Sequence, residues 1–88
     1  MEDLITKRAL ELIERANEFL ETKEILEELQ ISLDKLTRTK LFSRLNNLRG
    51  EGLIKGKFVG PGKGVWIWWK KDGFSNNIED KNGDNNDK

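Results

Sequence analysis

The stretch from residue 37 to residue 54, TRTKLFSRLNNLRGEGLI, constrains the fold of this chain more than any other. Three leucines in it share one face of an α-helix at the i, i+4, i+7 spacing: Leu41, Leu45 and Leu48. Thr37 is placed to cap the first turn with its hydroxyl, and Gly50 and Gly52 are placed to end the helix. The pattern therefore predicts a helix over 37–49, followed by an extended run.

The opposite face of this expected helix is polar and contains no acidic residue. It carries short or amide side chains, with a lysine at its flank: Thr39, Lys40, Ser43, Asn46 and Asn47. Side chains of this kind form hydrogen bonds with base edges, and an amide can bind adenine through two hydrogen bonds at once. A capped helix with such a face is typical of a helix that lies in the major groove of DNA.

The residues after this helix predict a two-stranded β-hairpin over 53–70. Two runs rich in β-branched and aromatic residues flank the turn sequence GPGKG at 60–64. Side chains alternate along a strand, so Trp66 and Trp68 are expected on one face and Trp69 on the other. Lysines lie along the hairpin and at its turn: Lys55, Lys57 and Lys63.

Two further helices are expected before residue 37. Residues 2–20 follow the helical period as one amphipathic helix, and Thr22 is placed to cap a second helix. Residues 30–36 either prolong that helix, start the next one early from Ser32, or form a connection; we favour the connection. Apolar side chains from the connection and the helices are expected in the core: Leu12, Ala16, Leu29, Ile31, Leu33, Leu36, Leu41, Leu45 and Leu48.

Charge is strongly segregated along a chain whose formal net charge is zero. Residues 1–34 carry four basic against ten acidic residues, a net charge of −6. Residues 35–71 carry ten basic residues against Glu51, a net charge of +9, and residues 72–88 carry two against five, a net charge of −3. A solvated charged face explains a short run of charge, but a basic segment that coincides with the helix and hairpin indicates a polyanion-binding surface.

Composition excludes several classes of function. Without cysteine or histidine the chain has no disulfide, no thiolate metal site and no imidazole base. No phosphate-binding loop or nucleophile–base pair occurs, and the acids of the first two helices have the spacing of a solvated face. We therefore expect a protein that is not an enzyme, with no cofactor and no bound metal. No apolar run could span a membrane, and we expect a cytoplasmic protein.

At 88 residues the chain has room for one domain, expected over 1–71. The acidic, asparagine-rich segment 72–88 is expected to be a disordered tail. The three tryptophans allow two interpretations: core packing, or surface contacts with a second copy or with unpaired bases. Possible dimer or partner contacts are Leu4, Trp66 and Trp68.

The expected order of three helices and a hairpin resembles the winged helix-turn-helix domain, an α+β fold. Within it, residues 37–54 are similar to the recognition helix and the start of the wing in PadR-like and MarR-like regulators. An aromatic residue at Phe42, then Leu45, Leu48 and the run Gly52-Leu53-Ile54, carry the similarity. The resemblance extends over residues 22–69 and implies DNA binding, as in small archaeal, plasmid or viral DNA-binding proteins. The G-Y-E-type second helix and the long C-terminal dimerisation helix of PadR-like proteins are absent.

These features together predict sequence-specific binding of double-stranded DNA by a small transcriptional regulator, acting as a homodimer. Base contacts are expected from Thr39, Lys40, Ser43, Asn46 and Asn47. Contacts with the DNA backbone are expected from Thr37, Arg38, Arg44, Arg49, Lys55, Lys57 and Lys63. The alternative is a winged helix that binds a protein partner within a partition or replication complex, with DNA binding secondary.

Overall fold

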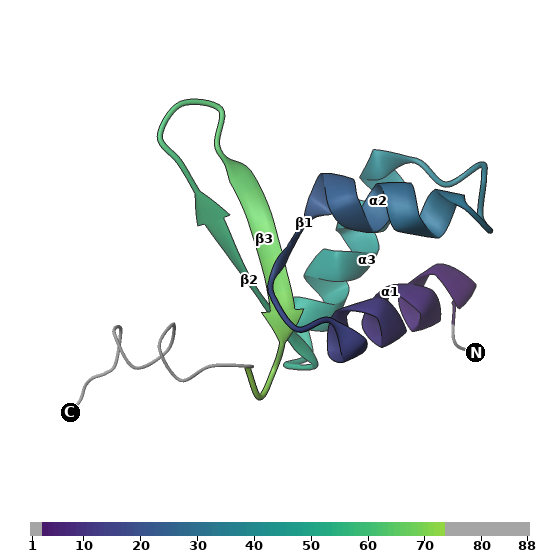
Figure 1. Cartoon of the computed structure of the whole chain (residues 1–88), viewed down its shortest axis with the longest axis horizontal. Coiled ribbons are helices and arrows are strands. Elements are labelled where there is room, and N and C mark those ends of the chain that lie inside the picture. The colour runs from purple at the N-terminus through teal and green to yellow at the C-terminus, as the bar shows by residue number, and fades with distance from the viewer. Residues whose placement is uncertain (1–2, 74–88) are drawn as a thin grey trace.

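A computed structural model of the chain describes residues 3–73 as three helices and a three-stranded antiparallel sheet, an α+β arrangement (Figure 1). In chain order the elements are α1 (Leu4–Arg15), β1 (Leu20–Glu21), α2 (Thr22–Gln30), α3 (Arg38–Gly50), β2 (Ile54–Val59) and β3 (Val65–Lys70). The helices lie on one face of the sheet. The predicted tail lies, from residue 74 onward, outside the described residues.

The hairpin predicted from the sequence is present as β2 and β3, and a third strand joins it. The sheet order is β1-β3-β2, so β3 is central. Phe58 pairs with Trp66 across the hairpin, and Leu20 of β1 pairs with Trp68 on the other side of β3. The predicted sheet had two strands, and this prediction was wrong because the short strand β1 is a third.

The first helix ends at Arg15, whereas one helix was expected over 2–20. Ala16 already has extended backbone angles, and the chain then runs to Leu20 in β1. The apolar residues at positions 16, 19 and 20 fit a helical period, but Leu20 packs against the core from a strand. Pairing of Leu20 with Trp68 is a long-range contact, and such contacts override local periodicity.

Thr22 is the first residue of α2 and not its cap, which corrects a second expectation. Glu21 is the N-cap residue, and its backbone N–H donates to a carboxylate oxygen of Glu24 at 2.8 Å. The Thr22 hydroxyl instead accepts a hydrogen bond from the indole Nε1 of Trp68 at 2.9 Å. Both side chains are buried, so the bond joins the start of α2 to the central strand inside the core.

Replacing Thr22 by valine is expected to lower the free energy of unfolding by about 1.5 kcal/mol, because the buried indole N–H would lose its acceptor. Thr22→Ser keeps the hydroxyl and is the matched control. It is expected to lower the free energy of unfolding by less than the valine variant does. Urea unfolding followed by circular dichroism measures both. Equal midpoints for the valine variant and the wild type would contradict the assigned hydrogen bond.

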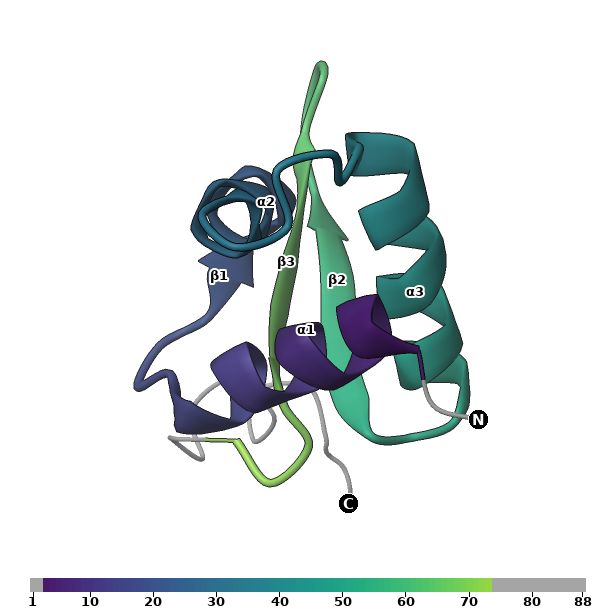
Figure 2. The same ribbon diagram turned by 90° about the vertical axis from the view of Figure 1, so that its right-hand side faces the viewer.

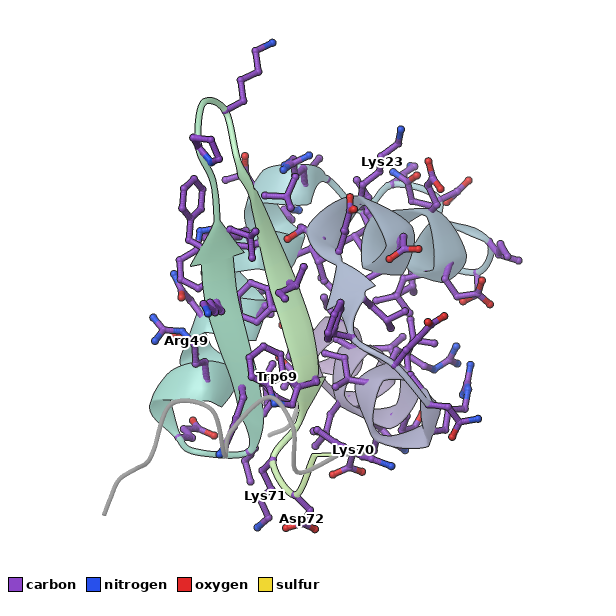
Figure 3. The ribbon with its side chains drawn as sticks, turned by 60° about the vertical axis from the view of Figure 1, so that its left-hand side comes forward. Lys23, Arg49, Trp69, Lys70, Lys71 and Asp72 are labelled. Carbon is purple, nitrogen blue, oxygen red and sulfur yellow. The ribbon has the colours of Figure 1, made fainter. Side chains whose placement is uncertain are left out.

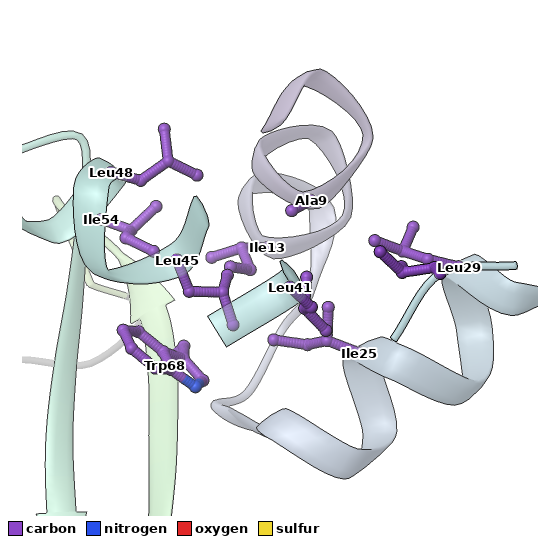
Figure 4. Close-up of a cluster of buried hydrophobic side chains, with 10 residues drawn as sticks. Ala9, Ile13, Ile25, Leu29, Leu41, Leu45, Leu48, Ile54 and Trp68 are labelled. Atoms are coloured by element: carbon purple, nitrogen blue, oxygen red, sulfur yellow. The ribbon is translucent and has the colours of Figure 1, made fainter. Parts of the chain in front are cut away.

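The core lies between the three helices and the sheet (Figure 4). Its fully or nearly buried members are Ala9, Ile13, Ile25, Leu29, Leu36, Leu41, Leu45, Leu48, Ile54 and Trp68. The leucine stripe of α3 is buried as predicted. Ile31 is 78 % exposed, so its expected place in the core was wrong, and Leu12, Ala16 and Leu33 are only half-buried. Ile31 lies directly after α2, where the chain turns outward, and the nearby Leu36 fills the core instead.

The end of α3 is set by a glycine, as the sequence predicted, although the helix includes Gly50. Gly52 has φ +79°, a conformation that favours glycine. Its N–H donates to the carbonyl of Arg49, and the N–H of Leu53 donates to the carbonyl of Leu48, each at 3.0 Å. This pair of bonds is the Schellman arrangement, which turns the chain sharply from α3 into β2.

Candidate nucleic-acid interface

The outer face of α3, which we define as Thr39, Ser43 and Asn47, is exposed opposite the buried leucines. Lys40 is also exposed, whereas Asn46 is half-buried. Thr37 caps the helix as predicted, because its hydroxyl accepts a hydrogen bond from the Lys40 N–H at 3.2 Å. The helix therefore presents hydroxyl, amide and ammonium groups to the surroundings from a rigid element.

Basic side chains and no acidic ones occur within α3. Arg38, Lys40 and Arg49 are exposed, and the first acid that follows is the C-cap residue Glu51. The acids of the first two helices are exposed elsewhere: Glu11, Glu14, Glu24, Glu27 and Glu28. Figure 2 shows α3 on one side of the molecule and α2 on the other. The charge segregation in the sequence thus becomes a separation between faces, which lets a polyanion approach α3 without meeting the acids of α2.

Arg44, expected on the DNA backbone, is paired with Asp3 at the start of α1. The Arg44 Nε donates to one carboxylate oxygen of Asp3, whose other oxygen accepts from the Ile5 N–H at 3.1 Å and caps α1. These two bonds hold the pKa of Asp3 below its ordinary value of 3.8, and the bond from Arg44 has the larger effect. One carboxylate thus fixes the start of α1 and neutralises part of the charge on the flank of α3.

Replacing Arg44 by alanine is expected to raise the pKa of Asp3 toward 3.8, although the Ile5 N–H still favours the ionised form. Because the folded-state pKa is lowered, ionised Asp3 stabilises the fold above its unfolded-state pKa. That contribution is lost as the pH falls through the folded-state pKa. An NMR titration of the Asp3 carboxyl carbon measures the shift, with Arg15→Ala as control. An unchanged Asp3 pKa in Arg44→Ala would contradict the pairing.

The hairpin carries its lysines as expected, and its turn extends past the helices (Figure 1). Lys63 is exposed in the turn between β2 and β3, and Lys57 is exposed on β2. Lys55 is half-buried and lies opposite Trp69 in the register. The reach of the turn suits Lys63 for contact with a large neighbour that also touches α3.

The structure places Trp68 in the core, which corrects its assignment as a partner contact. Trp68 is fully buried, and Trp66 stacks on it with ring centroids 5.3 Å apart and planes at 20°. Phe42 of α3 contacts both rings edge-on, each at 5.8 Å between centroids. Trp69 lies on the other face of β3 and contacts Phe19 edge-on. Packing within the fold accounts for Trp66 and Trp68. Leu4 is 48 % exposed and stays a predicted dimer or partner contact.

Arg49 is held by two contacts that the sequence analysis did not anticipate. Its guanidinium carbon lies 5.3 Å from the centre of a Trp66 ring, and its NH2 donates to the Asn46 Oδ1 at 3.2 Å. The i, i+3 spacing of Asn46 and Arg49 was visible in the sequence and could have indicated the hydrogen bond. The tryptophan contact depends on how the hairpin packs against α3, which the spacing does not show.

Neither a metal-binding cluster nor a membrane-spanning helix occurs among residues 3–73. Within residues 3–73 no three acidic side chains converge as a metal site would require. None of the helices there is long and apolar enough to cross a membrane. Comparisons with known proteins add no assignment: no protein-family model matches the sequence, and no curated protein or solved structure matches it either.

Proposed function

We propose that this protein binds double-stranded DNA as a small transcriptional regulator, with α3 in the major groove. The observation that carries the proposal is the outer face of α3, an exposed polar surface on a helix that contains no acid. Base edges are read by short hydroxyl and amide side chains, and phosphates by cations beside them. The basic residues of α3 and the hairpin supply the second requirement.

The order of the elements supports a winged helix-turn-helix as the form of this domain. In this interpretation α2 and α3 are the two helices of the helix-turn-helix, and the β2–β3 hairpin is the wing. The connection from residue 31 to 37 lets α3 leave α2 at an angle, and the Schellman turn sends the chain directly into the wing. Two separate elements then reach one ligand.

Within this proposal the outer face of α3 contacts bases, with Asn47 best placed among its residues. Its amide has no hydrogen-bond partner among the described residues, so both polar atoms are available to an adenine. Arg38, Lys57 and Lys63 contact the DNA backbone. A homodimer would place two such surfaces on a palindromic operator, which is the usual arrangement for helix-turn-helix regulators.

A mobility-shift assay tests the proposal on the DNA directly upstream of the protein's own coding sequence, at two salt concentrations and with random competitor DNA. A discrete complex that resists the competitor supports specific binding. If random competitor DNA removes the complex with the upstream DNA as readily as it removes any other complex, the protein has only a general affinity for polyanions. Sedimentation of the complex with DNA gives the number of copies bound.

The alternative of a protein-binding winged helix placed its main contacts at Trp66 and Trp68, with the acidic first two helices as a further partner surface. Trp68 is fully buried, and Trp66 is covered by aromatic rings and by Arg49. The two side chains proposed as its main contacts are thus engaged in packing within the fold.

A further inference from the structure

We infer that Arg49, Asn46 and Trp66 form a preorganised phosphate-binding site between α3 and the hairpin, in which Asn46 positions Arg49 and does not read a base. The inference rests on the proposed DNA binding and specifies how one of its contacts is made. It also reassigns Asn46, which the sequence placed among the base contacts.

The Arg49 side chain contacts the hairpin at two points along its length. Its stem passes over Gly56 of β2, where a Cβ atom would lie 3.2 Å from the Arg49 Cδ. The guanidinium then lies over Trp66 at 5.3 Å, and Trp66 is itself held by Phe42 and Trp68. An arginine over an aromatic face is attracted by the ring while its edge stays open to hydrogen-bond acceptors.

Asn46 fixes the orientation of the guanidinium plane. Its Oδ1 accepts one N–H of Arg49, which leaves the other guanidinium donors unused. The same oxygen would have to accept from adenine in a two-bond contact, so the bond to Arg49 takes one of its two lone pairs and holds the half-buried amide in one orientation, which disfavours that contact. Asn47 is one residue further along, is more exposed, and has no such commitment.

The surroundings of Arg49 favour an anion with several oxygens. Arg49 is exposed, and in the described part of the chain no carboxylate is paired with it, in contrast to Arg44. Figure 3 shows Arg49 at the edge of the sheet that β2 forms, pointing away from α1 and α2. A guanidinium fork held in one orientation suits the two free oxygens of a phosphodiester. Because its contacts with Trp66 and Asn46 restrict the side chain before binding, binding costs less conformational entropy than for a free arginine.

The test uses a mixed-sequence DNA duplex, on which a base reader and a phosphate contact behave differently. The binding constant is measured by fluorescence anisotropy over a range of salt concentrations for the full chain. Arg49→Ala is expected to weaken binding about fivefold and to lower the salt slope by about 0.9, the loss of one phosphate contact. Asn46→Ala is expected to weaken binding about two- to threefold with the salt slope unchanged, since no charge is removed.

Asn17→Ala is the matched control, the same change at an exposed asparagine between α1 and β1, outside α3 and the hairpin. It is expected to leave binding to mixed-sequence DNA unchanged, because Asn17 is not part of the proposed surface. In the Arg49→Ala background the Asn46→Ala change is expected to have no further effect, which a purely structural role on α3 would not produce. Circular dichroism confirms that each variant is folded.

The outcomes separate this inference from the function on which it depends. If the wild-type protein shows no salt-dependent binding to the duplex, the proposed function fails and the phosphate site fails with it. If the wild type binds but Asn46→Ala leaves binding unchanged as Asn17→Ala does, or weakens binding in the Arg49→Ala background as much as it does alone, the inference alone is overturned. The expected results for the three single variants and the double variant would support both the proposed function and the phosphate site.

Discussion

Replacing Gly56 by alanine is expected to lower the free energy of unfolding by about 3 kcal/mol, at the upper end of the usual cost of overpacking. The added Cβ would lie 2.5 Å from Cε3 and 2.6 Å from Cζ3 of Trp68. These distances are far inside van der Waals contact, so either the ring or the strand must move.

Trp68 has little freedom to give way. It is fully buried, its Nε1 is bonded to Thr22, and Trp66 stacks on its face. Gly56 is the cross-strand partner of Trp68. Because glycine has no side chain, the indole of Trp68 fills the space that a side chain at this position would occupy. A tryptophan over a cross-strand glycine is a known way to stabilise a glycine within a sheet.

Gly50→Ala is the matched control for this variant. No neighbouring atom lies within 4 Å of its added Cβ, and Gly50 lies in the last turn of α3. We expect that change to stabilise the protein by up to about 1 kcal/mol through helix propensity. Thermal unfolding measures both, and the Gly56 variant should melt roughly 12–24 °C below the wild type. An equal or higher melting temperature for Gly56→Ala would show that Trp68 is not fixed as described.

Replacing Lys40 and Lys63 together by alanine is expected to weaken binding to duplex DNA about 30-fold at about 0.15 M salt, with a salt slope smaller by about 1.8. Lys63 is taken to neutralise one phosphate, and Lys40, on the flank of the outer face, is taken to neutralise another in place of the base contact expected from the sequence. Lys40 is on α3 and Lys63 is in the hairpin turn, so the double variant tests whether both elements contact the same DNA. The single variants should each weaken binding about 5.5-fold, and their effects should multiply because the sites are far apart.

The control is Lys7→Ala with Arg15→Ala, which removes the same charge from α1. Both side chains line a polar groove that also contains Glu28 of α2. We expect less than about a threefold change from the control, since charges beyond a Debye length are screened. Equal losses in the two double variants would show that net charge governs binding and that α3 and the hairpin form no specific surface.

Local sequence signals were sufficient for α3, the element on which the proposed function rests. The leucine spacing, the Thr37 cap and the glycine stop all act within a few residues, and the structure confirms each of them. The hairpin was predicted for the same reason, because its turn sequence and its β-branched and aromatic runs are adjacent along the chain. The segregation of charge is likewise a property of the order of residues.

The tertiary structure alone decided the features that join distant segments. Leu20 leaves the helical pattern because it pairs with Trp68, and Thr22 accepts a hydrogen bond from that same residue, 46 positions along the chain. Gly56 lies beneath the Trp68 ring, and Arg49 is oriented by Trp66. The sequence by itself determined which residues form the polar helix and the lysine hairpin, because periodicity and capping are local. How the tryptophans share the core, and which side chains of α3 remain available to a ligand, depended on packing between elements, which no spacing along the chain encodes.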